Sequence, residues 1–243
     1  MPSFLWYDDI INLNREMCIM QLSDTTIQIL KNFATINPNI VVKTGKVLET
    51  ISVAKNILGR VEVDEEFTQE FGIYDLNVFL NVLGLVDQPN LKFQDGYVLI
   101  GDSTGRSKIK YYFCAPSLLT APTKEIKMPE TDISFTLDND TFSKIKRAAS
   151  ALDKTELIIT GKTNIVNLSV GEDGNETTNT FSIDVDGKSK VDKYRLIYNI
   201  SNLKFLPGTY QVDISSKLIS KFTNSNENLC YWIALEKNST YGV

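Results

Sequence analysis

The sequence predicts an α+β protein made of two similar units, each an antiparallel sheet carrying two helices. Short alternating runs rich in Val, Ile, Tyr, Phe and Thr, separated by Gly-containing turns, predict the sheets. Four segments with helical periodicity predict the helices. These helical segments recur in two pairs at nearly the same offset, which predicts the duplication. The 243 residues suffice for one large domain or two small ones.

The strand pattern is clearest in eight runs, and their spacing is typical of antiparallel hairpins. The predicted strands are 39–43, 46–55, 97–101, 108–114, 156–161, 165–170, 180–185 and 210–215. The turn signals beside them are Thr44-Gly45, Asp95-Gly96, Asp173-Gly174-Asn175, Asp186-Gly187 and Pro207-Gly208.

The helical pattern predicts helices over 23–36, 75–86, 138–152 and 199–206. Ser23 or Asp24 is the expected N-cap of the first helix, and Asp75 that of the second. Pro207-Gly208 is expected to end the fourth helix.

The first and third helices align at a shift of 116 positions, which places Lys31 on Arg147 and Gln28 on Lys144. The sequence IYDL at 73–76 recurs as IYNI at 197–200, a shift of 124. Either match alone could arise by chance, but together they indicate a duplicated unit. The expected organisation is a first domain at 20–114, a connector at 115–131 with three Pro, and a second domain at 132–243.

The composition argues against several function classes. The chain has no His, so His-based nucleophile activation and His-ligated metals are absent. Cys18, Cys114 and Cys230 are odd in number and far apart, which favours reduced thiols over disulfides or a zinc site. No apolar run is long enough to cross a membrane, and the first residues lack the pattern of a signal peptide. We therefore expect no membrane association.

Other candidate sites are weak, and we predict no catalytic residue, no cofactor and no metal. The segment 101–107 resembles a phosphate loop but lacks its spacing, so a hairpin turn is expected. The acidic clusters 64–66 and 172–173 are expected to be solvated turns. The segment 184–187 has the first half of a calcium loop without the closing Glu.

The outward faces of the predicted helices are neutral to basic, although acidic residues outnumber basic ones by 30 to 25. Lys31 and Arg147 occupy the same outward position of the repeat. The other polar residues expected on these faces are Gln28, Asn32, Asn77, Asn81, Lys144, Asn202 and Lys204. Such a surface can contact phosphates without reading bases, and would hold DNA loosely. The alternative is a solvated helix face with no ligand.

Several stretches resemble the sliding clamps of T-even-like bacteriophages. They are MQLSDTT (20–26), LKNFATIN (30–37), IYDLN (73–77), NISNLKFLPGTY (199–210) and IALEKNST (233–240). They occur in the family's order and cover the chain from Met20 to Val243. The resemblance implies the processivity-clamp fold, with two similar domains per subunit, a homotrimeric ring, and helices lining the central hole.

The same resemblance implies a non-enzymatic role in the cytoplasm of an infected bacterial host. The implied partners are double-stranded DNA bound without sequence specificity, DNA polymerase, a clamp-loader ATPase complex, and the phage late-transcription factors on RNA polymerase.

By analogy with the family, strand edges 108–114 and 179–186 would meet between subunits. The residues expected there are Lys108, Lys110, Tyr112, Phe181 and Ile183. An apolar pocket for the tail peptides of partners would include Leu118, Leu119, Ala234 and Leu235. For the two leucines of the connector, simple packing of the connector is the alternative.

Residues 1–19 precede the family's usual start and are assigned as an N-terminal extension. A flexible tail or a start codon assigned too early would explain them. Alternatively, the segment SFLWYDD (3–9) mimics a partner's aromatic tail peptide and fills the pocket.

Two other function classes compete with the clamp. A β-rich structural protein of a phage tail or capsid would explain the strands and the lack of catalytic residues, but not the duplicated cationic helices. A carboxylate-based hydrolase would require one essential Asp or Glu.

Overall fold

A computed structural model describes residues 19–162, 164–175, 177–191 and 193–242. The predicted extension at 1–19, including Cys18, lies outside these residues except for Ile19. The helices are α2 (Asp24–Ile36), α3 (Leu76–Leu83) and α4 (Asn139–Leu152), with 3-10 turns η1 (Pro116–Leu118) and η2 (Ile200–Asn202).

The strands fall into two sets along the chain. Before the connector come β1 (Ile19–Met20), β2 (Ile40–Val42), β3 (Gly45–Ile51), β4 (Ile57–Phe67), β5 (Phe71–Ile73), β6 (Asn90–Gln94), β7 (Tyr97–Gly101) and β8 (Lys108–Tyr112). After it come β9 (Ile133–Leu137), β10 (Glu156–Lys162), β11 (Ile165–Gly171), β12 (Phe181–Ser189), β13 (Tyr194–Asn199), β14 (Tyr210–Ser215), β15 (Ile219–Asn224), β16 (Leu229–Ala234) and β17 (Thr240–Tyr241).

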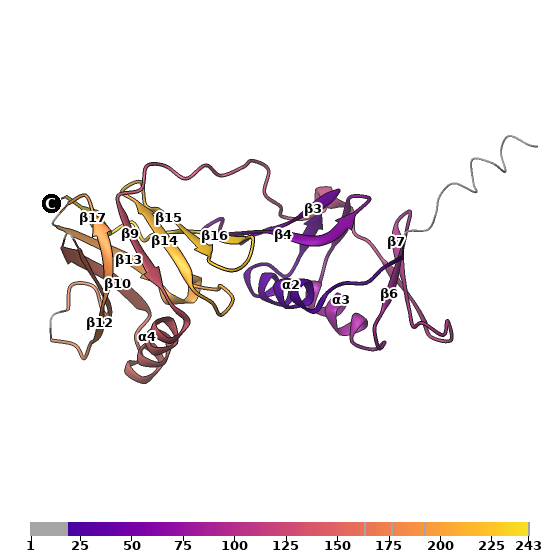
Figure 1. Cartoon of the computed structure of the whole chain (residues 1–243), viewed down its shortest axis with the longest axis horizontal. Helices are drawn as coiled ribbons and strands as arrows, with labels where there is room; N and C mark the ends of the chain where they lie inside the picture. The colour runs from indigo at the N-terminus through magenta and orange to yellow at the C-terminus, as the bar shows by residue number, and fades with distance from the viewer. Residues whose placement is uncertain (1–18, 163, 176, 192, 243) are drawn as a thin grey trace, which may run out of the picture.

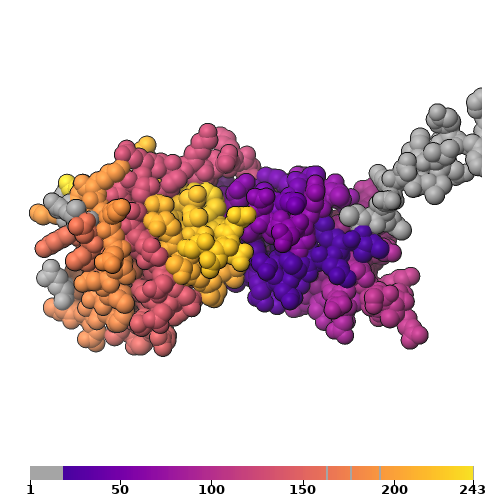
Figure 2. All heavy atoms as spheres, viewed as in Figure 1, coloured from indigo at the N-terminus to yellow at the C-terminus, as the bar shows by residue number. Residues whose placement is uncertain are grey.

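One sheet runs through both halves of the chain. Its order is β17-β13-β10-β11-β12-β9-β14-β15-β16-β4-β3, so β16 of the second half pairs with β4 of the first. The antiparallel register runs from Leu229 opposite Val61 to Ile233 opposite Ile57. Figure 2 shows the yellow C-terminal region against the indigo first half. The first half also contains a four-stranded sheet, β1-β6-β7-β8, and the β2-β5 pair.

The three helices lie on one side of the sheets, and the connector crosses the opposite side (Figure 1). Helix α2 packs against α3 and against β3 and β4, whereas α4 packs against β11 and β12. The buried face of α2 is apolar, with Ile29, Leu30 and Phe33 all at most 3 % exposed. Burial of these amphipathic faces holds the helices on the sheets.

Capping side chains fix where the helices begin. The Ser23 hydroxyl accepts the Thr26 N–H of α2 at 3.1 Å, and the Asp138 carboxylate accepts the Thr141 N–H of α4 at 2.7 Å. Asp75 accepts two backbone N–H groups at the start of α3. These contacts confirm the first three predicted helices, although α3 ends at Leu83, before the predicted Val86.

The fourth predicted helix, 199–206, is wrong, so the described residues of the second half contain one α-helix and not two. The segment forms only the 3-10 turn η2. The Asn199 side chain accepts the N–H of Ser201 and also its hydroxyl, at 3.0 and 2.7 Å. Such local bonds compete with helix formation, and a short segment of Ser and Asn gains little from helical propagation. Leu203 and Phe205 are buried instead.

Burial along α2 and α4 agrees with the predicted repeat. Ile29 and Ile145 are both buried, as are Phe33 and Ala149, at the shift of 116. Lys31 and Arg147 are both exposed.

The turn predicted at Asp186-Gly187 is also wrong, because β12 continues through it to Ser189. Gly187 pairs with Phe135 of β9. A Cβ at this position would lie 2.5 Å from the Val166 side chain and 2.9 Å from the Ser134 carbonyl oxygen. The glycine therefore permits a close approach of strands.

The acidic cluster 64–66 lies on strand β4 and not in the predicted turn. The predicted strand 46–55 is shorter than expected, because β3 ends at Ile51. The hairpin turn predicted at 101–107 is confirmed between β7 and β8, where the Asp102 carboxylate accepts the N–H groups of Arg106 and Ser107 at 3.2 Å.

A small polar network ties α2 to the second half, and we call it the Asn32–Tyr231 bridge. The Tyr231 hydroxyl donates to the Asn32 side-chain oxygen at 2.8 Å. The Asn32 amide donates to the Lys204 carbonyl at 3.1 Å. The Lys204 ammonium donates to the Thr35 carbonyl at 2.7 Å, where the α2 dipole favours a cation. The bridge fixes α2 relative to the second half.

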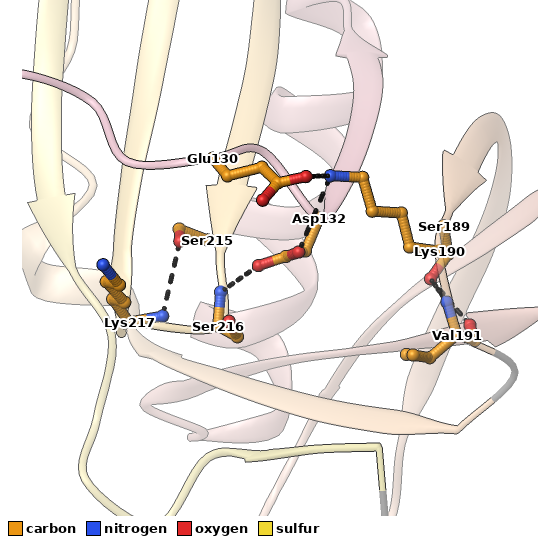
Figure 3. A network of polar contacts seen from close by, with 8 residues as sticks. All are labelled: Glu130, Asp132, Ser189, Lys190, Val191, Ser215, Ser216 and Lys217. Atoms are coloured by element: carbon orange, nitrogen blue, oxygen red, sulfur yellow. Dashed lines mark hydrogen bonds and ion pairs between the residues drawn. The ribbon is translucent and has the colours of Figure 1, made fainter.

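The connector is anchored at both ends. At its start, the Cys114 N–H donates to the Gly72 carbonyl at 2.8 Å, and the Asn37 amide reaches the Thr120 carbonyl at 3.4 Å. At its end, Asp132 accepts the Ser216 N–H at 2.7 Å, and Lys190 pairs with Glu130 and Asp132 (Figure 3). Between these two anchored ends, the connector runs from the first half of the protein to the second.

We predict that Tyr231→Phe lowers the free energy of unfolding by about 1 to 2 kcal/mol, because it removes the hydrogen bond to partly buried Asn32. Urea unfolding measures the loss. Tyr194→Phe is the matched control: its hydroxyl is buried without a hydrogen-bond partner among the described residues, so its removal should cost nothing. Equal losses in the two variants would contradict a specific role for the bridge.

Candidate DNA-facing surface, subunit edges and partner cleft

The helix face opposite the connector carries the cations predicted to contact DNA. Lys31 of α2 and Arg147 of α4 are exposed and form no ion pair with any described residue. Gln28, Asn77 and Asn81 are also exposed on α2 and α3. The three helices that carry these residues share one side of the molecule (Figure 1).

Three of the residues predicted on this face have contacts within the protein. Lys144 forms a 2.6 Å ion pair with Asp140 one turn earlier in α4, which offsets its charge. The side chains of Asn32 and Lys204 are held in the Asn32–Tyr231 bridge. The side chains of Asn32 and Lys204 therefore help to join the two halves. Asn202 is half-buried in η2.

The sequence reasoning missed Lys146, an exposed residue of α4 beside Arg147. Its ammonium lies 5.5 Å from the centre of the Phe142 ring. The comparison of repeats could not find it, because its counterpart at the shift of 116 is Leu30, which is buried. Helical periodicity alone would have placed it outward.

Glu65 of β4 positions the start of α2. Its carboxylate accepts the Ser23 N–H at 2.6 Å and the Thr26 hydroxyl at 2.7 Å. Partial burial raises the pKa of Glu65, but these hydrogen bonds together outweigh it, and the net effect is a lowered pKa. A carboxylate at the N-terminus of a helix also interacts favourably with its dipole.

Strand β8 is the outer strand of its sheet, hydrogen-bonded along its length to β7 alone among the described strands. Lys108, Lys110 and Tyr112 are exposed on one of its faces, whereas Ile109 and Tyr111 are half-buried on the other. The Lys110 ammonium lies 3.9 Å from the centre of the Tyr97 ring and 4.8 Å from that of Tyr112. Such contacts order a lysine on the surface.

Most of strand β12 also has an open edge. Residues 181–186 pair with β11 on one side, but on the other side β9 pairs only with Gly187, Lys188 and Ser189. Phe181 and Ile183 are half-buried and pack toward the core, while Asp184 and Asp186 are exposed. The two open edges therefore present opposite charges on their exposed faces: lysines on β8 and aspartates on β12.

Three exposed apolar residues, one on α3 and one beyond each of its ends, were also missed by the sequence reasoning, and we call them the apolar stripe of α3. Tyr74, Val78 and Leu85 are 72 %, 48 % and 76 % exposed. The Phe79 ring of α3 contacts the Tyr111 ring of β8 at 5.1 Å, so the helix and the open edge are neighbours. Exposed apolar groups at helical spacing were the available signal.

The four residues predicted for the partner pocket have different environments. Leu235 is only 6 % exposed and belongs to the core. Leu119 rests where a side chain on Gly72 would otherwise lie. Ala234 is half-buried opposite Ile219, and Leu118 is 77 % exposed on η1. The assignment of these four residues to a partner pocket stays a prediction.

A cleft of about 350 Å³ lies between the connector and the sheet, and we call it the connector cleft. Its lining residues are Glu49, Leu58, Arg60, Lys124, Glu125, Ile126, Lys127, Met128, Lys221, Cys230 and Trp232. It combines an apolar part with four cations and two carboxylates. The Lys221 ammonium lies 5.4 Å from the Trp232 ring. Arg60 is paired with Glu49 at 3.3 Å.

Two groups in the connector cleft are chemically distinctive. Trp232 is 8 % exposed, and its indole N–H has no hydrogen-bond partner among the described residues. Burial raises the pKa of the Cys230 thiol, which keeps it protonated at neutral pH. The unpaired indole donor is the feature that a bound acceptor could satisfy.

Within the described residues, no group of three or more Cys, Asp or Glu side chains is arranged to hold a metal ion. None of the described helices is long and apolar enough to cross a membrane. The cluster 172–173 is engaged in surface contacts: Glu172 pairs with Lys154 at 2.9 Å, and Asp173 pairs with Arg195.

Comparison with known proteins decides the family. Residues 23–128 match the DNA polymerase processivity factor family. The chain is 30 % identical over 230 residues to the sliding clamp of Escherichia phage RB69, covering 91 % of this chain and 99 % of that protein. The chain belongs to the sliding-clamp family. This membership favours the clamp over the tail or capsid protein and over the hydrolase.

Solved clamps share the fold. The structure of Archaeoglobus PCNA, described as "C-terminal region of FEN-1 bound to A. fulgidus PCNA", superposes with a TM-score of 0.66 at 12 % identity, covering 91 % of this chain and 98 % of that one. The Helicobacter pylori beta clamp bound to a DNA ligase peptide gives a TM-score of 0.64 at 13 % identity, covering 93 % of this chain and 67 % of that one. The processivity-clamp fold is therefore shown.

Proposed function

We propose that this clamp assembles into a homotrimeric ring that encircles double-stranded DNA and tethers the phage DNA polymerase. One observation carries the proposal: α2, α3 and α4 lie on the same side of the molecule. Two of these helices carry the exposed cations Lys31, Lys146 and Arg147, although the net charge of the protein is −5. A ring holds DNA by enclosure, so the lining needs no base-specific contact and the clamp itself performs no chemistry.

The charge density of this face suits sliding. Helix α4 has 14 residues and spans about 21 Å. Duplex DNA presents about twelve phosphate charges over that length. A trimer would bring about nine cations to this stretch, Lys31, Lys146 and Arg147 from each subunit, and phosphates are alike at every position along the duplex. The helix face would therefore attract the duplex without fixing its position.

Subunits would join head to tail through the open edges of β8 and β12. Each edge has unpaired backbone N–H and C=O groups, and a heterologous contact of this kind closes into a ring when its rotation allows. Lys108 and Lys110 would face Asp184 and Asp186 across the joined sheet. Half-buried Tyr111, Phe181 and Ile183 would become buried on the helix side, with the apolar stripe of α3 beside them.

The matching burial patterns of α2 and α4 support two similar domains in each subunit. We propose residues 20–114 and 132–243 as these domains, with 115–131 as the connector. The extended course of the connector after η1 supports this division. A trimer would then contain six similar domains arranged around the ring.

The connector cleft is the proposed docking site for the tail peptides of partners. Its excess of cations favours acidic peptides, and its apolar floor favours aromatic or aliphatic side chains. Two of the solved clamps hold such a segment, the C-terminal region of FEN-1 in one and a DNA ligase peptide in the other, which supports this use of the fold. DNA polymerase, the clamp-loader ATPase complex and the late-transcription factors are the proposed partners, in the cytoplasm of the infected host.

We expect Lys31→Glu combined with Arg147→Glu to shorten the products of primer extension by about tenfold, because two inward cations become repulsive to phosphates. Sedimentation should show an unchanged trimer. Lys46→Glu with Lys162→Glu is the control, since both lysines are exposed strand residues. Normal product lengths from the helix variant would contradict the DNA-facing assignment.

Reversing one edge should break the ring, and reversing both should restore it. Lys108→Glu with Lys110→Glu is expected to raise the trimer dissociation constant by at least about tenfold, because like charges then meet across the interface. Adding Asp184→Lys and Asp186→Lys should recover most of the loss. Sedimentation velocity over a dilution series measures it. Absence of any recovery would place the interface elsewhere.

A further inference from the structure

The connector cleft has the chemistry of a receptor for an aromatic and acidic peptide. Lys124 and Lys127 are exposed on the connector at its rim, and Lys221 lies over Trp232. Arg60 is already neutralised by Glu49, so these three lysines are the cations left to attract an anion. Their side chains form no ion pair with the residues the structure describes.

A second observation points to a ligand in the connector cleft. The Trp232 indole N–H is buried and has no hydrogen-bond partner within the part of the chain that the structure describes. A buried donor left unpaired costs free energy, and a carbonyl or carboxylate oxygen placed there would recover it. The cleft is therefore complementary to a peptide both in charge and in hydrogen bonding.

The sequence of the chain itself contains such a peptide. Residues 3–9 read SFLWYDD: four consecutive large apolar or aromatic side chains followed by Asp8 and Asp9. These residues lie outside the described part of the structure. Their order, an apolar block followed by two negative charges, matches the apolar floor and the lysine rim of the connector cleft.

We propose that residues 3–9 occupy the connector cleft of their own chain or of a second copy, and so compete with partner peptides. The aromatic block would cover Leu58, Ile126 and Met128. Asp8 and Asp9 would face the lysines of the rim. The inference rests on the proposed use of this cleft as the docking site for partners.

The length of the intervening chain sets the reach of residues 3–9. Ile19 is the first described residue, in β1 beside β6. Nine residues, 10–18, lie between it and Asp9, and the ten steps from Cα to Cα can span at most about 36 Å. A tether of this kind produces an effective concentration in the millimolar range, so a weak intrinsic affinity is enough for competition. The chemistry is the same whichever copy supplies the cleft.

The test compares the full chain with a variant lacking residues 1–18. The probe is a fluorescent peptide of residues 1–12, measured by polarisation. We expect saturable binding to the truncated protein, about tenfold tighter than to the full chain, in which the attached segment already competes. The same peptide with Asp8→Asn and Asp9→Asn should bind less tightly and lose its dependence on salt.

Variants of the exposed rim locate the site. Lys124→Glu with Lys127→Glu in the truncated protein should weaken the probe by about tenfold, because both substitutions place negative charge beside Asp8 and Asp9. Lys46→Glu with Lys162→Glu is the charge-matched control and should have no effect. Equal weakening by both variants, or equal binding to full and truncated chains, would overturn the inference.

A second probe separates this inference from the proposed function. It is the C-terminal peptide of the DNA polymerase from the same phage. If that peptide binds the connector cleft but the peptide of residues 1–12 does not, the inference about residues 3–9 is wrong and the docking function stands. If neither peptide binds, the docking function itself is wrong.

Discussion

The antiparallel pairing of β16 with β4 is the constraint on which the rest of the structure depends. It joins strands from the two halves into one sheet, and a slip of one residue in its register would turn every side chain of β16 to the opposite face. The Asn32–Tyr231 bridge adds a second attachment on the helix side. With the halves joined at both levels, α2, α3 and α4 share one side and the connector occupies the other.

The proposed function assigns three tasks to one acidic chain. The helix side carries the exposed cations Lys31, Lys146 and Arg147, which are proposed to meet the phosphates of DNA. The open edges of β8 and β12 carry opposite charges and are proposed to join subunits. The connector side carries a cationic cleft that is proposed to bind peptides. Each task uses a different property. The helices carry a few cations, and the sheet edges have unpaired backbone groups. The connector cleft has an apolar floor. A tether that works by enclosure needs all three but no catalytic group.

Much of this was accessible from the sequence, for local reasons. Capping residues such as Ser23, Asp75 and Asp138 accept hydrogen bonds from backbone N–H groups at most three residues away. The local sequence is therefore enough to predict where these helices begin. The predictions failed where distant residues decide. Segment 199–206 has helical periodicity, but Leu203 and Phe205 are fixed by the core. Gly187 has the appearance of a turn residue, but its role is close approach to β9 and β11. The connector cleft combines residues from 49 to 232, and no local pattern could have grouped them.

The most direct test of enclosure is retention on DNA of defined topology. The protein is incubated with the proposed clamp loader, ATP and nicked circular DNA, and the bound fraction is followed by gel filtration before and after one restriction cut. Enclosure predicts that the clamp stays on the circle and leaves through the free ends once the DNA is linear. Equal retention on circular and linear DNA would show that the protein grips the duplex, and would contradict the central claim.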